Sequence, residues 1–486
     1  MSNGLPPVPP IPMNRCAPRS FRAAAVLVLA AFILTASGCG YLSFYTRQTT
    51  WRKAFENQPR MSLIQRFAPG DLLLINGRIN NFEQGRGPLL LAAVSSQYRE
   101  NEIVALTVIR DPFEGYNLFL APGDYGFFVF ADVNGNSLFE RNELVGQTSM
   151  LVTAAKGNAN NVTEGPAISV DYRNTGKTVF RVRVKVRAAD YIYSSLDDEF
   201  FDPRYGNAGL YNPAGLMAHT QGFLFGLEDY DERKTMVIFV HGIAGTPRDW
   251  KFFVEGMDRA RFQPFFLYYP SGMPLEKIGS LLAQFIDSVD KGTGTGRQNI
   301  VLAAHSMGGL VSLSAIEKLT AEGFPSSLRL YCSFSTPYGG DPAARAGVEN
   351  APAVVPVWRD IAAGSEFLRK VQAQRFPASL PFHLFFSYND PSSLKLGESS
   401  DGSVTLSSQL VPVVQDWAIK VIGFNDSHTG ILNSEAARAS FLRLLENAAP
   451  TAAPAVEEPV SAGNTSAPAE EPVNSDDAPA PLEVNP

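Results

Sequence analysis

The stretch N-I-V-L-A-A-H-S-M-G-G-L-V, residues 299–311, decides how the second half of the chain folds. Its first six residues form an apolar run typical of a strand buried in a parallel sheet, and a helix is expected to begin near Met307. Ser306 stands at the corner between them. A serine at such a sharp strand–turn–helix corner presents its hydroxyl above the sheet edge, which suits a nucleophile. Small residues are needed beside it, and Ala304 and Gly308 meet that need.

Strands and helices alternate on both sides of this corner. Apolar strands are expected at 235–242, 265–270, 299–304, 328–334, 382–388 and 418–423. Helices are expected around 249–260, 275–290, from Met307 onward, and over 433–447. Such alternation implies right-handed crossovers and a doubly wound, mostly parallel sheet. Residues 235–447 are therefore predicted to form an α/β catalytic domain.

A serine nucleophile needs a base, and the chain has five histidines. His428, in F-N-D-S-H-T-G, follows the last expected strand and precedes the last helix, where the base falls when the chain order is Ser, acid, His. The other four lie elsewhere: His219 precedes the sheet, His241 closes its first strand, His305 flanks the serine and points elsewhere from the corner, and His383 begins a strand. His428 is therefore predicted to be the base.

The acid that orients the imidazole has three candidates. Asp401 lies in D-G-S-V, where Gly402 allows a tight turn and Val404 anchors it in the core. Asp390 also follows the penultimate strand. Asp426 is a weaker candidate, because a position only two residues before the base leaves its carboxylate little room to reach the imidazole. An orienting carboxylate needs a rigid turn near the sheet edge, so we favour Asp401 over Asp390.

A reaction at this serine also needs donors for the negative oxygen of the transition state, typically two backbone N–H groups. The loop H-G-I-A-G-T-P, residues 241–247, follows the first strand of the domain. We expect Ile243 to supply one N–H and Met307, directly after the serine, the other.

The motifs of 235–447 resemble those of α/β-hydrolase lipases and esterases. The similar segments are H-G-I-A-G-T-P, Y-Y-P-S-G at 268–272, A-H-S-M-G-G-L-V, S-T-P-Y-G-G at 335–340, D-G-S-V and D-S-H, in family order. The resemblance implies ester hydrolysis through an acyl-enzyme, with no cofactor. Acyl transfer by the same residues and a non-enzymatic envelope scaffold are the alternatives. An intact set of serine, histidine, aspartate and oxyanion loop favours an enzyme.

Residues 1–38 are predicted to be a targeting segment. Three arginines precede the uncharged stretch Ala23–Ala36, which is short for a spanning helix, and A-S-G-C then ends at Cys39. This resembles a bacterial lipoprotein signal, in which Cys39 is lipidated and becomes the N-terminus. A plain secretory signal and an uncleaved anchor are the alternatives. All three place the body outside the cytoplasm. In a two-membrane bacterium Gly40, which stands where aspartate would favour retention in the inner membrane, implies the outer membrane.

The remaining segments differ in composition. Residues 39–69 are expected to be a neck, 70–187 a small β-sandwich of short strands split by turns, 188–234 a linker, and 448–486 a disordered tail. That tail contains seven acids and eight prolines. The net charge of −7 comes with no basic face, so a nucleic-acid partner is not expected. The predicted partners are an ester or lipid substrate and the membrane.

A possible calcium loop lies in the β-rich domain, in D-V-N-G-N-S-L-F-E-R-N-E at 132–143. The oxygen-bearing side chains that match calcium-loop positions are Asp132, Asn134, Asn136, Glu140 and Glu143. Ser137 stands where such loops carry glycine, and the flanks read as strands rather than helices. A polar hairpin turn is the alternative.

Residues 341–380 separate two strands of the catalytic domain and contain the apolar run A-P-A-V-V-P-V-W at 351–358. Two interpretations stay open: a lid or acyl-pocket wall over the serine, or a pair of core helices that cover the sheet.

Overall fold

The computed structural model describes residues 73–83, 86–95, 102–109, 116–136, 138–153, 162–176, 186–187, 195–220, 223–228, 230–292, 299–350, 354–389 and 399–448. The predicted signal segment 1–38, Cys39, the neck 39–69, Ser137, Asp390 and nearly all of the tail 448–486 lie outside these residues.

The first domain contains two main sheets. Four antiparallel strands pair in the order β4-β3-β6-β8, and they are β3 (Leu89–Ser95), β4 (Glu102–Ile109), β6 (Gly123–Ala131) and β8 (Leu144–Val152). The second sheet has the order β5-β1-β9, with β1 (Leu73–Gly77), β5 (Tyr116–Leu120) and β9 (Val162–Glu164). Two short pairs are β2 (Ile79–Asn80) with β10 (Ile168–Ser169), and β7 (Leu138–Phe139) with β11 (Val186–Arg187).

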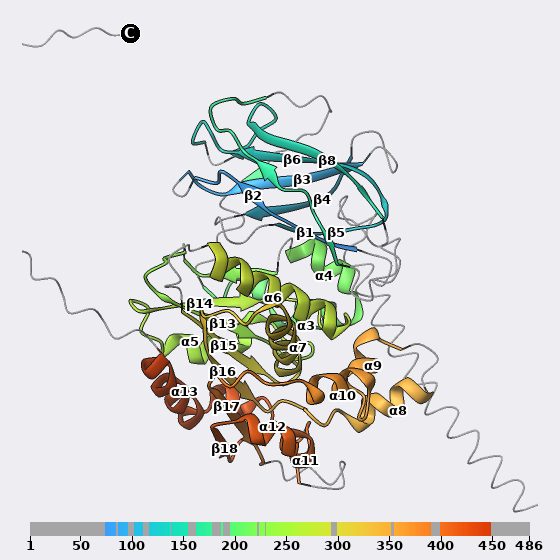
Figure 1. Cartoon of the computed structure of the whole chain (residues 1–486), viewed down its shortest axis with the longest axis vertical. Coiled ribbons are helices and arrows are strands. Elements are labelled where there is room, and N and C mark those ends of the chain that lie inside the picture. The colour runs from blue at the N-terminus through green and yellow to red at the C-terminus, as the bar shows by residue number, and fades with distance from the viewer. Residues whose placement is uncertain are drawn as a thin grey trace, which may run out of the picture. The chain divides into compact units, whose positions relative to one another are not determined.

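One apolar core joins the two sheets of this domain. It contains Ile75 and Leu118 from the three-stranded sheet, and Leu91 and Phe127 from the four-stranded sheet. Strand β3 is buried along its whole length because a second cluster, around Leu90, covers its other face. Two sheets that share a core are the arrangement that the β-sandwich prediction requires. Figure 1 shows these strands in blue and blue-green.

The second domain, which the sequence predicts to be catalytic, is built on a seven-stranded sheet with the order β12-β14-β13-β15-β16-β17-β18. Its strands are β12 (Leu224–Gly226), β13 (Thr235–Val240), β14 (Phe262–Leu267), β15 (Ile300–His305), β16 (Leu328–Phe334), β17 (Phe382–Ser387) and β18 (Lys420–Phe424). The six strands from β13 to β18 all run parallel to one another. The edge strand β12 is antiparallel to β14. The doubly wound, mostly parallel sheet predicted from the sequence is confirmed.

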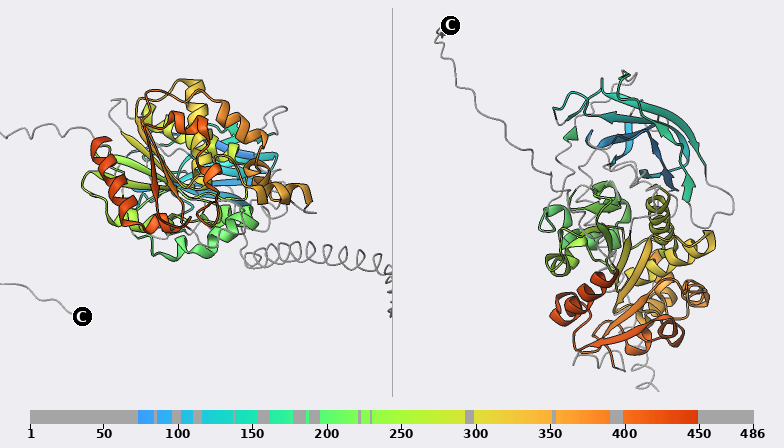
Figure 2. Two further views of the ribbon diagram at one scale, coloured as in Figure 1. Left: turned by 90° about the horizontal axis from the view of Figure 1, so that it is seen from below. Right: turned by 60° about the vertical axis from the view of Figure 1, so that its left-hand side comes forward.

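Helices cover both faces of this sheet (Figures 1 and 2). On one face α6 (Leu275–Gly292), α7 (Met307–Glu322), α9 (Pro356–Ile361), α10 (Glu366–Ala373) and α12 (Pro412–Trp417) share a core with the strands. On the other face the core includes α5 (Lys251–Glu255) and α13 (Glu435–Ala448). The shorter helices are η4 (Pro247–Trp250), α8 (Pro342–Asn350), α11 (Leu406–Gln409) and η6 (Gly430–Asn433).

The strand order reverses beside β13. The chain runs from β13 outward to β14 and returns on the other side of β13 as β15. In open α/β sheets the crevice at the carboxyl ends of strands around such a reversal is where ligands bind. The loop after β13 and the corner after β15 therefore lie side by side at this edge.

The segment expected to be a linker between the domains contributes to the catalytic domain. Residues 195–228 include η3 (Glu199–Phe201), α3 (Pro203–Tyr211) and α4 (Pro213–Thr220) as well as the edge strand β12. Phe200 and Phe201 pack in the same core as α13. The structured part of this domain thus begins well before Thr235, where the sequence placed its start.

Helices α9 and α10 answer the question left open for residues 341–380. Val357 and Ile361 of α9 and Leu368 of α10 are buried in the core that they share with α7. This burial favours the interpretation as core helices that cover the sheet. The preceding helix α8 has one buried residue, Ala344.

Candidate active site

Ser306 occupies the corner between β15 and α7 in a backbone conformation that few residues adopt, with φ 53° and ψ −128°. Such a conformation is strained for a residue with a side chain and persists only where the surroundings impose it. The Ser306 N–H donates to Phe334 O of the neighbouring β16 at 2.8 Å. Gly308 allows α7 to approach β13, because a Cβ there would lie 2.5 Å from Val240 O. The corner predicted from the sequence is therefore present.

The structure brings Ser306, His428 and Asp401 into one hydrogen-bonded chain. His428 Nε2 lies 2.8 Å from Ser306 Oγ, and His428 Nδ1 lies 2.7 Å from Asp401 Oδ2. His428 stands on the loop between β18 and η6, and Asp401 on the turn after β17. Of the other two candidates for the acid, Asp390 lies outside the described residues, and His428 Nδ1 is directed at Asp401 rather than at Asp426.

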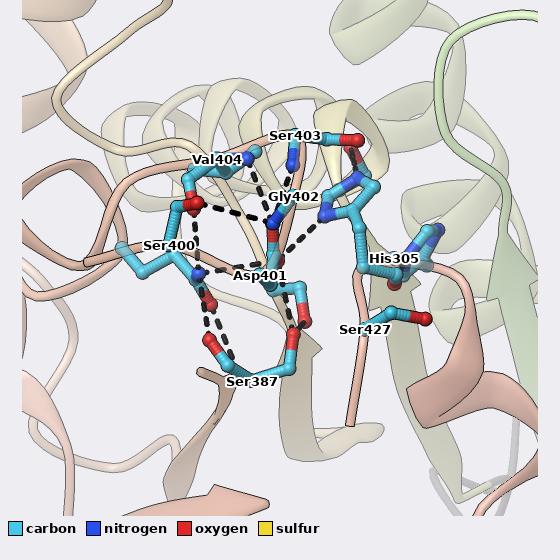
Figure 3. Close-up of polar contacts among 12 residues, drawn as sticks. His305, Ser387, Ser400, Asp401, Gly402, Ser403, Val404 and Ser427 are labelled. Atoms are coloured by element: carbon cyan, nitrogen blue, oxygen red, sulfur yellow. Dashed lines mark hydrogen bonds and ion pairs between the residues drawn. The ribbon is translucent and has the colours of Figure 1, made fainter. Parts of the chain in front are cut away.

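A buried network surrounds the carboxylate of Asp401 (Figure 3). Its Oδ1 accepts from the N–H groups of Ser403 and Val404, at 3.0 and 2.7 Å. Its Oδ2 accepts from Ser387 Oγ at 2.9 Å and from Gln409 Nε2 at 3.2 Å, in addition to the imidazole. These donors fix the orientation of the oxygen that faces His428.

The pKa of Asp401 is lowered although the side chain is buried. Burial alone would raise this pKa, but the hydrogen bond and charge of His428, with the N–H groups of Val404 and Ser403, outweigh it. The carboxylate therefore stays ionised at neutral pH, as is required of a group that holds one tautomer of the imidazole and stabilises its protonated form.

The two predicted oxyanion donors follow adjacent strands of the sheet. Ile243 follows β13 and Met307 follows Ser306, and β13 pairs with β15 so that Val240 lies opposite Ala304. Met307 is the first residue of α7, so its N–H has no carbonyl partner within the helix. Among the described residues, no acceptor is found for the Ile243 N–H. Both groups are thus available to a ligand.

His241 fixes the peptide that carries the Ile243 N–H. Tyr269 N donates to His241 Nε2 at 3.3 Å, so the proton of the neutral ring lies on Nδ1, which donates to Gly242 O at 2.8 Å. Gly245 N donates to the same carbonyl at 3.2 Å. In a trans peptide the N–H points away from the carbonyl, so the Ile243 N–H is directed away from these donors.

The rest of the oxyanion loop is held by residues that the sequence did not single out. Ala244 has a φ of 53°, and its N–H donates to Ser271 Oγ at 3.0 Å. Thr246 Oγ1 donates to Phe201 O at 3.0 Å, and Thr246 N donates to Asp249 Oδ2 at 3.1 Å. Ser271 belongs to the quoted motif Y-Y-P-S-G, which was a usable signal. Phe201 carried no such signal, because it lies in the expected linker.

The five side chains of the predicted calcium loop lie together in the β-domain. Asn136 N donates to Asp132 Oδ1 at 3.0 Å, and Glu140 Oε2 accepts from the side-chain amides of Asn134 and Asn136 at 2.9 and 3.2 Å. Glu143, 2% exposed, accepts from Glu140 N at 2.9 Å. Within the described part of the chain, no group of three or more His, Cys, Asp or Glu is arranged to hold a metal. Calcium binding therefore stays a prediction.

Two further features concern membrane-spanning helices and the cysteine in β16. No helix among the described residues is long and apolar enough to cross a membrane. Cys332 is fully buried in β16, and burial raises the pKa of its thiol. It is a core residue.

Comparisons with known proteins found one matching family model and several similar solved structures. Residues 237–418 match a family model described as "Alpha/beta hydrolase family". The lipase BlEst2 of Bacillus licheniformis, in mature form, is similar at 17% identity over 46% of this chain and 98% of its own, with a TM-score of 0.38. Aspergillus fumigatus lipase B is similar at 16% identity over 49% of this chain and 58% of its own, with a TM-score of 0.36. Phospholipase PlaB of Legionella pneumophila is similar at 14% identity over 36% of this chain and 45% of its own, with a TM-score of 0.31.

The search of curated proteins found no match. The family match runs from within β13 to the end of α12. It therefore covers the sheet reversal, the oxyanion loop, the serine corner and the turn of Asp401. Residues 237–418 therefore have the α/β-hydrolase fold and match the model of that family.

Proposed function

We propose that this protein is a serine hydrolase that cleaves carboxylic esters through an acyl-enzyme. Ser306 acts as the nucleophile, His428 as the general base and Asp401 as the acid that orients the imidazole. The observation that carries the proposal is the continuous set of contacts from Ser306 Oγ to His428 Nε2 at 2.8 Å, and from His428 Nδ1 to Asp401 at 2.7 Å.

The chemistry follows from these contacts. Ser306 Oγ attacks the ester carbonyl while its proton passes to His428 Nε2, and the imidazolium is stabilised by ionised Asp401. The negative oxygen of the tetrahedral intermediate accepts from the N–H groups of Ile243 and Met307. His428 then protonates the departing alcohol. In the second half, water gives a proton to His428 as it attacks the acyl group. The intermediate then collapses to release the carboxylic acid, and His428 returns the proton to Ser306 Oγ.

The enzyme is proposed to act at a membrane surface. A diacylated Cys39 gives stable attachment, because two chains bind a bilayer far more tightly than one. Gly40 after the anchor cysteine favours the outer membrane of a two-membrane bacterium. Substrates at that surface include lipid esters, and the predicted products are a carboxylic acid and an alcohol.

Covalent labelling tests the nucleophile. A fluorophosphonate probe should label the wild-type protein at Ser306, and Ser306→Ala should abolish labelling. Ester hydrolysis should fall by at least about 10⁴-fold, because the acyl-enzyme can no longer form. Mass spectrometry of the labelled peptide, with p-nitrophenyl butyrate hydrolysis in parallel, measures both effects.

Ser314→Ala is the matched control. Ser314 lies on the same helix, is 1% exposed, and its hydroxyl has no hydrogen-bond partner among the described residues. This variant should label and hydrolyse as the wild type does. Full labelling of Ser306→Ala would contradict the assignment of the nucleophile. Release of acyl groups to an added alcohol in preference to water would favour acyl transfer over hydrolysis.

A further inference from the structure

His305, the residue before the nucleophile, makes a contact that spans 123 residues of sequence. Its Nε2 lies 2.8 Å from the backbone carbonyl oxygen of His428, and the residue is 4% exposed. A carbonyl oxygen only accepts, so the ring carries its proton on Nε2 and donates it to His428. Figure 3 shows His305 to one side of the Asp401 network.

With this contact, both the N–H and the carbonyl of His428 are held by hydrogen bonds. The N–H of His428 donates to Asp401 O at 2.9 Å, and its carbonyl accepts from His305. On either side in the loop, Ser427 and Thr429 are exposed and offer the backbone no core packing. The two hydrogen bonds therefore hold a residue whose imidazole must reach Ser306 and Asp401 at once.

The ring of His305 also lies between the base and the oxyanion loop. The centroids of the His305 and His428 rings are 4.9 Å apart. A Cβ placed on Gly242 would lie 3.3 Å from His305 Nδ1 and 2.9 Å from Ser306 Cβ. One buried ring thus contacts the base and lies against the loop that carries an oxyanion donor.

His305 remains uncharged while the base gains its proton. Burial, and next the proximity of His428, lower the pKa of His305 to about 3. A neutral ring adds no positive charge beside the imidazolium that forms on His428, so it does not oppose the proton transfer.

We propose that His305 is a positioning residue, whose Nε2–H holds the His428 carbonyl and thereby keeps the imidazole aligned between Ser306 and Asp401. This role rests on the proposed function, since it presupposes that His428 is the base. His305 is not the base, and its contact with His428 O gives it a separate role.

Three substitutions of His305 test the contribution of the Nε2–H donor separately from that of the ring. Gln places its amide nitrogen near the position of Nε2, Asn places it near Nδ1, and Phe keeps the ring without a donor. With p-nitrophenyl butyrate, His305→Gln should keep kcat within about threefold of the wild type. His305→Asn and His305→Phe should lose about 10- to 100-fold in kcat, because a displacement of the base by about 1 Å costs that much. KM should stay unchanged, since His305 is placed to contact no substrate.

Thermal unfolding of each variant separates alignment from folding. The proposal is supported if kcat falls in the His305→Asn variant and is retained in the His305→Gln variant, while the two variants have equal melting temperatures. Equal kcat in the Gln and Asn variants, whether high or low, overturns it. If the Phe variant fails to fold, the Gln and Asn pair still decides the outcome.

Labelling distinguishes this inference from the function on which it rests. A wild-type protein that does not react with the fluorophosphonate contradicts the proposed function itself. A wild-type protein that labels at Ser306, together with an Asn variant that labels at the same rate, overturns the role of His305 alone.

Discussion

The carboxylate of Asp401 accepts five hydrogen bonds from described residues and is 1% exposed. Its folded-state pKa is lowered, so the carboxylate contributes stability that is present above its unfolded pKa of about 3.9 and is lost as the pH falls through the folded value. The charge of Asp401 is therefore constant over the pH range in which a histidine imidazole gains or loses its proton.

Replacement of Asp401 tests its role as the orienting acid. Asp401→Asn should lower kcat by about 10³- to 10⁴-fold at pH 7, because the amide no longer holds the required tautomer and charge. Asp390→Asn should have a far smaller effect. Steady-state rates on a soluble ester check both variants.

Asp426→Asn is the control for a carboxylate close in sequence to the base. Its rate should stay within about twofold of the wild type, since His428 is directed at Asp401. The reverse ranking of the Asp390 and Asp401 variants would move the acid to Asp390 and leave Ser306 and His428 in place.

At the scale of single residues, the sequence was informative where local chain geometry carries the chemistry. Ser306 was recognisable because the corner needs an apolar strand, small neighbours and a helix in immediate succession. Ser387 and Gln409 were not predicted as partners of Asp401. Their contacts join three separate segments, and nothing in the spacing of those segments specifies which polar side chains meet. The tautomers of His241 and His305 depend in the same way on tertiary neighbours.

Among the elements, α3 shows why the sequence of residues 188–234 predicts a linker. Its sequence, P-R-Y-G-N-A-G-L-Y, is poor in helix-forming residues. The helix forms because Asp202 caps it, with Oδ1 accepting from Arg204 N at 2.9 Å, and because it packs on the oxyanion loop. A Cβ on Gly206 would lie 2.0 Å from Ala244 O, so the glycine that lowers helix propensity is also the one that the packing needs.

The helical turn η4, directly after the oxyanion loop, contains a carboxyl group with an unusual titration. Burial raises the pKa of Asp249 to about 6, and the hydrogen bond from Thr246 N opposes this only in part. The folded state thus binds a proton more tightly than the unfolded chain. Stability should therefore fall as the pH rises from about 4 to about 6, and the loss should persist above that range.

Asp249→Asn should remove this penalty. The amide keeps an acceptor for Thr246 N and, like the protonated carboxyl group, carries no charge. At pH 8 the variant should be more stable than the wild type by about 1–3 kcal/mol, and the difference should shrink as the pH falls through 6 towards 4. Urea unfolding at several pH values measures the difference.

Asp258→Asn serves as the comparison. Asp258 is exposed and accepts from Ala260 N at 3.0 Å, so its replacement should change stability little and equally at every pH. An Asp249→Asn variant whose stability relative to the wild type is the same at pH 8 and pH 4 would contradict the raised pKa.

For the whole molecule, the predicted anchor has a consequence for rate. Cys39→Ser should release a soluble protein that cleaves p-nitrophenyl butyrate as fast as the anchored form. Its rate on a fluorogenic ester carried in phosphatidylcholine vesicles should fall by roughly tenfold or more, because surface attachment raises the effective concentration of enzyme and substrate.

Reconstitution of the anchored protein into the same vesicles provides the matched measurement. Equal vesicle rates for the anchored and released forms would mean that the anchor sets location alone. A Cys39→Ser protein that stays with the membrane fraction would instead contradict lipidation at Cys39.

The order of Ser306, Asp401 and His428 along the chain has a consequence in time. His428 follows Ser306 by 122 residues, and the strands β17 and β18 lie between them in the sequence. A chain is synthesised from its N-terminus onward, so the serine emerges long before its partners. In the proposed mechanism His428 activates Ser306, so Ser306 should have the reactivity of an ordinary alcohol until β18 and the loop after it have joined the sheet. An incomplete chain that ends before His428 should therefore cleave no esters, and reactivity should be among the last properties that the growing chain acquires.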